Sequence, residues 1–349
     1  MTYNRIATPR IYMDRLSFDL ATGQRTISNY TITDDAGSPA TVTPSSGDFE
    51  DLFDLRPSNY ITIASNTQQF YITIDTGVTS DTVAEANFLA ILGHNFHSSD
   101  AVFLLRHSDN SDLSGSTVVT LDGGHTAVIN AATDSGNDDY VDPASNGWTL
   151  ITWANNNTNN RYYRLEITDN TGTTSNFDNP VKIGAIMLGE YIDFPNSPDL
   201  DVGFSIDYDG SKLLTSAGGN TFAASSYLGS PPWGGTNPWV LASEDTQAYK
   251  LARHYGRRKY DMNFSYVADT SLFLSNMHAA HGNMVDGSDL YSQFYHKALG
   301  QHLPFLFTID SASTGAGDYG LFRLADSEMK TKQVAHQAWN TSLSLVESW

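Results

Sequence analysis

The segment Ala338-Trp339-Asn340-Thr341-Ser342-Leu343-Ser344-Leu345-Val346-Glu347-Ser348-Trp349 alternates apolar and polar side chains up to the last residue of the sequence. Such alternation is typical of a strand with one buried face, because successive side chains point to opposite sides of a sheet. A terminus with this pattern has to be held in a sheet. We therefore expect the segment to pair inside its own sheet, with Leu343 and Leu345 on one face.

The hundred residues before this segment repeat the same theme. Strands are predicted over 260–266, 304–310 and 319–324, where aromatic and aliphatic residues are concentrated. Two helices are predicted near 270–281 and 289–299, because Asp, Ser and Thr precede each segment and a glycine follows it. We therefore predict a β-rich assembly domain with one or two helices over 195–349.

Regularly spaced short strands also fill the segment 50–194. Alternation over 69–75 and 161–167 and apolar runs over 87–93 and 101–106 are separated by turns rich in Gly, Asn, Asp and Ser. This pattern predicts a jelly-roll β-sandwich, and the fold class is mainly β. The first 49 residues are predicted to be irregular, with short strands. Two prolines, Pro195 and Pro198, mark the expected connector between the domains.

Composition excludes several classes of protein. The chain has 349 residues and no cysteine, so disulfides, thiolate metal sites and thiol nucleophiles are absent. Its formal charge of −20 disfavours nucleic acid and anionic membranes as partners, because its field repels phosphate. No apolar stretch approaches the roughly 20 residues of a membrane span, and no signal-type apolar core follows the first residues. We expect folding in a cytoplasm.

Motifs for catalysis and metal binding are weak. The pairs His278/His281 and His94/His97 have the spacing of zinc ligands. No adjacent carboxylate completes a catalytic metal-binding pattern, so we expect these histidines to bind no metal. Four acidic clusters are expected to be solvated turns, with a structural calcium as the alternative; they are Asp199/Asp201, Asp207/Asp209, Asp109/Asp112 and Asp134–Asp139. No nucleophile elbow or phosphate-binding glycine loop is present. The sequence predicts no enzyme and no cofactor.

Aromatic and basic residues suggest an interface. Tyr227, Trp233 and Trp239 occur in a segment rich in Gly and Pro, where a large ring has no obvious core to join. An interface with another subunit is the preferred interpretation, with local packing or stacking on sugars as alternatives. Arg257 and Arg258 belong to the one basic cluster of this acidic chain, and we expect them to pair with acidic groups on a neighbour.

Two resemblances to known families add to these expectations. The segments 88–96, 161–167 and 182–190 resemble, in order, galactose-binding-like (discoidin-type) β-sandwiches, and this resemblance covers roughly 50–193. The segments 256–264, 303–309 and 339–347, with the helical pair between them, resemble domains of tail and baseplate proteins of tailed bacteriophages.

The second resemblance implies a non-enzymatic virion structural protein, made in the host cytoplasm and placed in the tail tip or baseplate. It would assemble as a homo-oligomer with copies of itself and with other virion proteins. The alternative is a receptor-recognition protein that binds host-surface carbohydrate through the loops of the sandwich. A capsid decoration protein is a second alternative.

Overall fold

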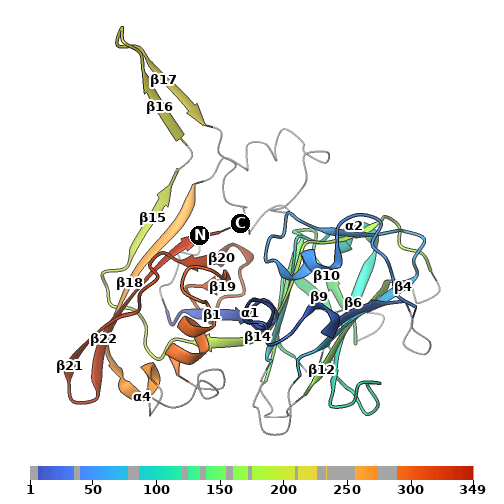
Figure 1. Ribbon diagram of the computed structural model, residues 1–349. Coiled ribbons are helices and arrows are strands. Elements are labelled where there is room, and N and C mark those ends of the chain that lie inside the picture. The colour runs from blue at the N-terminus through green and yellow to red at the C-terminus, as the bar shows by residue number, and fades with distance from the viewer. Residues whose placement is uncertain are drawn as a thin grey trace.

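The computed structural model confirms that the protein is mainly β (Figure 1). No helix among its described residues is long and apolar enough to cross a membrane. The structure describes residues 7–34, 40–77, 86–119, 125–133, 139–154, 160–171, 175–208, 211–225, 233, 256–273 and 289–348.

The largest element is an eleven-stranded antiparallel sheet. Ten of its strands follow one another across the sheet, and β21 (Lys330–Ala335) pairs with β22 beside this path. In spatial order the ten are β15 (Gly203–Asp207), β18 (Arg257–Ala268), β22 (Ala338–Glu347), β20 (Tyr319–Leu324), β19 (Phe305–Thr308), β1 (Arg10–Asp14), β14 (Ala185–Asp193), β5 (Phe88–Leu92), β11 (Trp148–Trp153) and β8 (His125–Ile129).

A seven-stranded sheet packs against one half of the large sheet. Its path is β2 (Tyr30–Thr33), β4 (Gln69–Asp75), β12 (Tyr162–Asp169), β6 (Ala101–Ser108), β10 (Val141–Pro143) and β9 (Ala131–Thr133), with β7 (Thr117–Val118) on β6. Two smaller pairs are β13 (Val181–Ile183) with β3 (Ile61–Ile63), and the hairpin β16 (Ser211–Thr215) with β17 (Thr221–Ser225).

Helical elements are short. They are α1 (Arg15–Thr22), η1 (Ile27–Asn29), η2 (Phe49–Phe53), α2 (Phe96–Ser99), α4 (Asp269–Leu272), the π-helical turn η4 (Tyr291–His296) and η5 (Ala316–Asp318). The helix predicted over 270–281 is present only as the single turn α4, which ends at Leu272 and is followed by Phe273 in an extended conformation; residues from 274 onward lie outside the described residues. The helix predicted over 289–299 contains η4, whose Phe294 is buried against Phe305 with the ring centroids 5.0 Å apart.

Three apolar cores explain the burial patterns. The sandwich core lies between the seven-stranded sheet and the strands β5, β11 and β14, and it contains Phe70, Ile72 and Ile91. A second core on the opposite face of these strands contains Phe88 and Trp148. Strand β5 is buried on both faces, which is why its sequence is an unbroken apolar run rather than an alternating one. The third core lies over the half formed by β18, β22 and β19.

Strand β1 joins the two halves of the large sheet. Its residues pair with β14 on one side, where Ile11 lies opposite Ile192, and with β19 on the other, where Ile11 lies opposite Phe307. The segment 1–49, predicted to be irregular, thus supplies a central strand. Its sequence does not alternate because Ile11 and Tyr12 face two different apolar cores. One sheet therefore runs across all three predicted segments of the chain.

A buried carboxylate stands where β1 turns into α1. Asp14 is 2% exposed, and it accepts hydrogen bonds from the backbone N–H groups of Leu16 (3.2 Å) and Ser17 (2.9 Å) at the start of the helix. The same carboxylate accepts the N–H of Leu188 on β14 at 3.0 Å. It thus satisfies backbone donors of a helix end and of a strand at once. Burial raises the pKa of Asp14 to about 6.

This carboxylate gives a test by pH. An acid whose pKa is higher in the folded state contributes stability below its unfolded pKa of about 3.9, and this contribution is lost as the pH rises through about 6. The variant Asp14→Asn cannot titrate at this position. We expect the free energy of unfolding of the wild type, relative to this variant, to fall by roughly 2 kcal/mol between about pH 4 and pH 7. Urea unfolding measures the free energy of unfolding of the wild type and of the variant at each pH. If the difference between the two stays constant or grows as the pH rises, the account is contradicted.

The expectation for the C-terminal strand is confirmed. Strand β22 pairs with β18, β20 and β21 within the chain, and Leu343 and Leu345 lie together in the third core. The opposite face of β22, with Asn340 and Ser342, belongs to the site described next.

Candidate functional site

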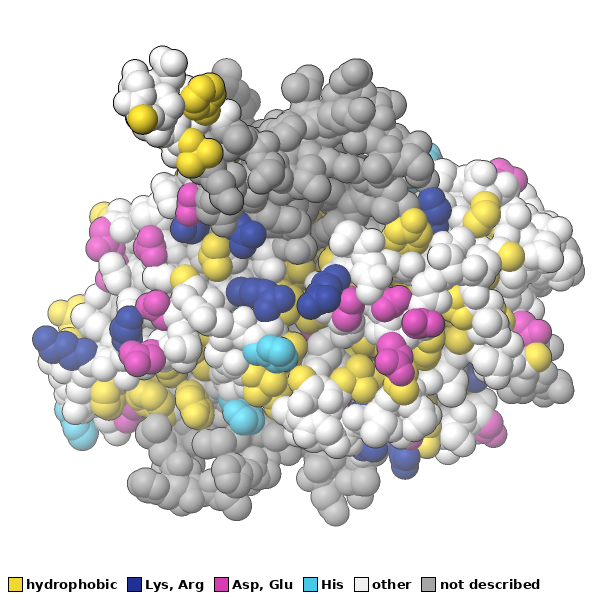
Figure 2. Space-filling view, turned by 45° about the horizontal axis from the view of Figure 1, so that its top comes forward, with side chains coloured by type: hydrophobic (Ala, Val, Ile, Leu, Met, Phe, Trp, Pro, Cys, Tyr) yellow, Lys and Arg dark blue, Asp and Glu magenta, His cyan; other side chains and the backbone are white. Residues whose placement is uncertain are grey.

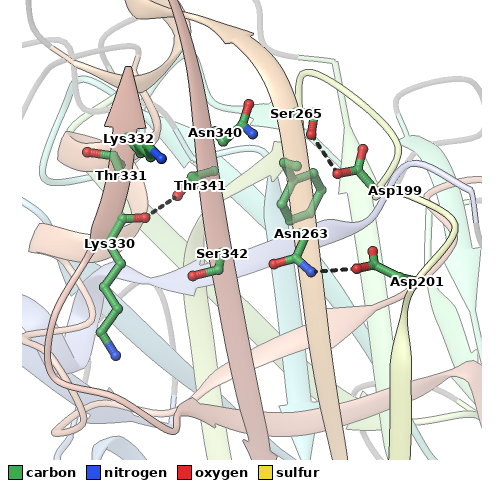
Figure 3. A pocket seen from close by; sticks show the side chains of 11 residues that line it. Asp199, Asp201, Asn263, Ser265, Lys330, Thr331, Lys332, Asn340, Thr341 and Ser342 are labelled. Atoms are coloured by element: carbon green, nitrogen blue, oxygen red, sulfur yellow. Dashed lines mark hydrogen bonds between the residues drawn. The ribbon is translucent and has the colours of Figure 1, made fainter. Parts of the chain in front are cut away.

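A polar groove lies at one end of the large sheet, on the face opposite the third core. Its volume is about 420 Å³. Figure 3 shows Lys330 and Lys332 on one side of it and Asp199 and Asp201 on the other. We call it the polar groove; besides these four its lining includes Asn263, Ser265, Thr331, Asn340, Thr341 and Ser342.

The strand registers place these side chains in rows. Lys330 on β21 lies opposite Ser342 on β22, and Ser342 lies opposite Asn263 on β18. Next to this row, Lys332 lies opposite Asn340. Alternation along β18 turns Met262 and Phe264 into the third core, so Asn263 faces the other way, into the groove. The polar positions of these alternating strands thus form the floor and one wall of the groove.

The predicted interdomain connector forms the other wall. Its two aspartates are held against β18: the hydroxyl of Ser265 donates to Asp199 at 2.7 Å, and the amide of Asn263 donates to Asp201 at 3.0 Å. The backbone N–H of Asp199 also donates to the carbonyl of Asn263 at 2.8 Å. Because several bonds fix this wall, its carboxylates are positioned before any ligand arrives.

A β-bulge marks the edge of the groove. The register between β18 and β22 shifts between Phe264 and Val267, and Tyr266 within this shift has a φ of 56°. A bulky residue with positive φ is a strained exception, held in place by its surroundings. Here the N–H of Tyr266 donates to the side-chain oxygen of Asn340 at 3.2 Å, and the residue is 73% exposed. The bulge therefore presents an aromatic ring to solvent, and the backbone of Tyr266 contacts Asn340 of the groove.

Charges of both signs meet in the groove. The ammonium of Lys330 donates to Asp326 at 2.9 Å, and this hydrogen bond raises the pKa of Lys330 above its usual value. Lys330 therefore carries its positive charge at neutral pH, opposite the wall formed by Asp199 and Asp201 (Figure 3). The groove offers carboxylate oxygens as acceptors and ammonium, amide and hydroxyl groups as donors.

Sequence reasoning missed this site. It interpreted Asp199 and Asp201 as a solvated turn, with calcium binding as the alternative, and it gave no role to Asn263, Asn340 or Tyr266. The signal in the sequence was the run of polar side chains at alternate positions of two strands, but the pairing that brings them together is not encoded in either strand alone.

The predicted interface residue Trp233 lies in the interior. It is 2% exposed, its ring packs edge-on against Trp148 with centroids 5.2 Å apart, and its carbonyl accepts the indole N–H of Trp148 at 3.1 Å. Trp233 therefore packs locally, which was one of the alternatives, because the second core provides a site for the ring. Tyr227 and Trp239 lie outside the described residues.

The basic cluster is engaged within the chain. The guanidinium of Arg258 donates to Glu347 at 2.7 Å and to the carbonyl of Tyr319 at 2.8 Å, and the side chain of Glu347 is fully buried. Arg258 thus pairs with a carboxylate of its own sheet. Lys259 contacts Asp207 of β15, and Arg257 is half-buried at the start of β18.

The pair of Arg258 and Glu347 can be tested by a double-mutant cycle. We expect Arg258→Met to cost about 3–5 kcal/mol of unfolding free energy, because it leaves the buried carboxylate of Glu347 unpaired. The double variant Arg258→Met/Glu347→Leu should cost at least about 1 kcal/mol less than the sum of the single variants. Denaturant unfolding of Arg258→Met, Glu347→Leu and the double variant measures these costs.

A second ion pair of the chain serves as the control. The carboxylate of Asp193 bonds Arg10 at 2.6 Å but is 44% exposed, so Arg10→Met should cost about 1 kcal/mol or less. Equal costs for Arg10→Met and Arg258→Met would show that the burial of the Glu347 pair has no special importance.

The residues considered as metal ligands do not form a cluster in the described part of the chain. His94 is buried and contacts the hydroxyl of Thr149 at 3.1 Å, and burial lowers its pKa to about 3, whereas His97 is exposed. His278 and His281 lie outside the described residues. No group of three His, Asp or Glu side chains that could hold a metal occurs among the residues described, and the structural calcium stays a prediction.

Comparisons with known proteins assign no family. No family model and no curated protein matches the chain. Solved structures that resemble part of it include chitosan-binding module 1 of a chitosanase/glucanase from Paenibacillus sp. IK-5, with 12% identity and a TM-score of 0.29, covering 46% of this chain and 96% of the module.

Two further structures are similar to the same extent. A CBM32 of Clostridium perfringens in complex with GlcNAc-alpha-1,4-galactose has 12% identity and a TM-score of 0.28, covering 46% of this chain and 90% of the module. The CBM32 of AlyQ in complex with 4,5-unsaturated mannuronic acid has 17% identity and a TM-score of 0.24, covering 43% and 93%. All three are carbohydrate-binding modules, but at these TM-scores none assigns a ligand to this chain.

Proposed function

We propose that the protein binds carbohydrate in the polar groove and does not cleave it. The observation that carries the proposal is that hydrogen-bond acceptors and donors converge in one groove on the sheet, next to a residue, Tyr266, whose ring is exposed. Asp199 and Asp201 face Lys330 and Lys332 across a groove of about 420 Å³, a volume within the range of small-molecule sites.

The groove suits the chemistry of a pyranose. Each sugar hydroxyl both donates and accepts hydrogen bonds, so a ring of hydroxyls needs acceptors and donors close together. The carboxylates of Asp199 and Asp201 accept, while the ammonium groups of Lys330 and Lys332 donate. The apolar C–H face of the sugar can pack on the ring of Tyr266, which is 73% exposed.

The placement of the carboxylates supports binding without hydrolysis. Glycoside hydrolysis commonly requires two carboxyl groups that flank the scissile bond from opposite sides. Asp199 and Asp201 both lie on the connector wall, whereas the facing wall carries Lys330 and Lys332 (Figure 3). Among the residues that line the groove, both carboxyl groups therefore lie on the same wall and do not flank a bound sugar from opposite sides.

This proposal corresponds to the carbohydrate-binding alternative of the sequence analysis, moved from the sandwich loops to the groove. The role of a virion structural protein in a phage tail rests on the sequence resemblance alone and stays a prediction, as does a location in the virion.

Glycan-array binding by the full chain, followed by calorimetry with the best oligosaccharide, tests the proposal. We expect Asp199→Asn and Asp201→Asn each to weaken binding by about tenfold or more, because a hydrogen bond to a charged group is worth about 1.5–3 kcal/mol. Removing the ring with Tyr266→Ala should weaken it by about two- to tenfold.

The control variant is Asp178→Asn, which removes an exposed carboxylate on the sandwich and should bind as the wild type does. Loss of binding in the control but not in the groove variants would place the sugar on the sandwich. No binding to any glycan would refute the proposal, and release of new reducing ends from a bound glycan would refute its non-enzymatic part.

A further inference from the structure

A β-hairpin projects away from the body of the protein. It consists of β16 and β17, which pair with each other and form a sheet of their own among the described strands (Figure 1). We call residues 211–225 the arm. It follows β15, which pairs only with β18 in the described structure and so forms an edge of the large sheet.

Exposed apolar side chains concentrate on the arm and on the strand before it. On the arm, Leu213, Leu214 and Phe222 are 73%, 64% and 60% exposed. Leu214 lies opposite Phe222 and shares one face with it, while Leu213 lies on the other face, so both faces are apolar. Figure 2 shows hydrophobic side chains on the surface of the projecting hairpin.

A second apolar surface lies at the base of the arm. Phe204, Ile206 and Tyr208 alternate along β15 and just after it, and each is about half exposed. Phe204 packs against Tyr260 with ring centroids 5.1 Å apart, so this row continues the apolar face of β18 beyond the edge of the third core. We call these three residues the shelf.

These surfaces need a partner. An isolated two-stranded hairpin is marginally stable in water, and contiguous exposed apolar patches mark interaction sites. Leu214, Phe222 and the three shelf residues each expose on the order of 100 Å², so an arm packed on a shelf could bury roughly 500 Å² of apolar side chain per copy. For two copies this is roughly 1,000 Å², the smallest total expected of a biological interface.

A second copy of the chain supplies a matching surface as that partner. Each copy carries both an arm and a shelf, so two copies can cover each other's exposed apolar side chains without another protein.

We propose that the arm of one copy packs on the shelf of a second copy and that the shelf of the first receives the arm of the second. Such a reciprocal contact is isologous and closes as a two-fold dimer, because each copy contributes the same two surfaces. This interface differs from the one predicted at Trp233 and Trp239. The arm and the shelf share no residue with the polar groove, so carbohydrate binding and dimerisation can be tested separately.

Sedimentation of the full chain over a range of concentrations tests the dimer. We expect a dimer at micromolar concentration, and we expect Phe222→Ser and Leu214→Ser each to raise the dissociation constant by about 30-fold or more, the effect of losing a side chain at an interface hot spot. The control is Val334→Ser, which removes another exposed apolar side chain, 42% exposed, on β21; it should leave the dimer intact.

Cross-linking tests the reciprocal geometry. The chain has no cysteine, so a mixture of Ile206→Cys and Phe222→Cys proteins should give a disulfide-linked band at twice 38.2 kDa under oxidising conditions. The proposal is refuted if the arm variants dimerise as tightly as the wild type, or if the wild type stays monomeric. A monomer that instead sediments with phosphatidylcholine vesicles, and loses this property in Phe222→Ser, would identify the arm as a membrane contact and refute the dimer.

Discussion

The pairing of β1 with β14 on one side and β19 on the other is the constraint on which the rest of the structure depends. Through this one strand of five residues, the strands that build the sandwich and the strands that build the polar groove become parts of one sheet. Its side chains serve both faces, with Ile11 in the third core and Tyr12 in the second. The carboxylate of Asp14 then ties the end of β1 to the start of α1 and to β14.

The candidate site follows from this arrangement. The connector that carries Asp199 and Asp201 leaves the end of β14, beside β1: the N–H of Phe194 donates to the carbonyl of Pro9 at 3.0 Å, and its ring stacks on Phe264 at 4.7 Å. One wall of the groove is therefore positioned by the pairing of β1 and β14, and the other wall by the pairing of β21 and β22. A binding site held on strands in this way needs little ordering when a ligand enters.

The sequence was informative where one local pattern decides the structure. Alternation predicted β4, β12 and β22 with their buried faces, and capping residues indicated the helical turn at Asp269. It was uninformative for the short strand β1, whose two faces join different cores, and where residues distant in sequence meet. Nothing in the sequence near Arg258 shows that Glu347, 89 positions later, is its partner. Trp233 has glycine and proline neighbours typical of a loop, yet Trp148 gives its ring a core to join.

Native-state hydrogen exchange on the full chain tests most directly whether β1 makes one cooperative unit of the two halves. The account predicts that amides of β1, of β5 in the sandwich and of β22 beneath the groove share a single opening free energy equal to that of global unfolding, and that their exchange curves merge as denaturant is added. If the β22 amides instead exchange through a separate opening of lower free energy while β1 and β5 stay protected, the two halves are independent and the central role of β1 is wrong.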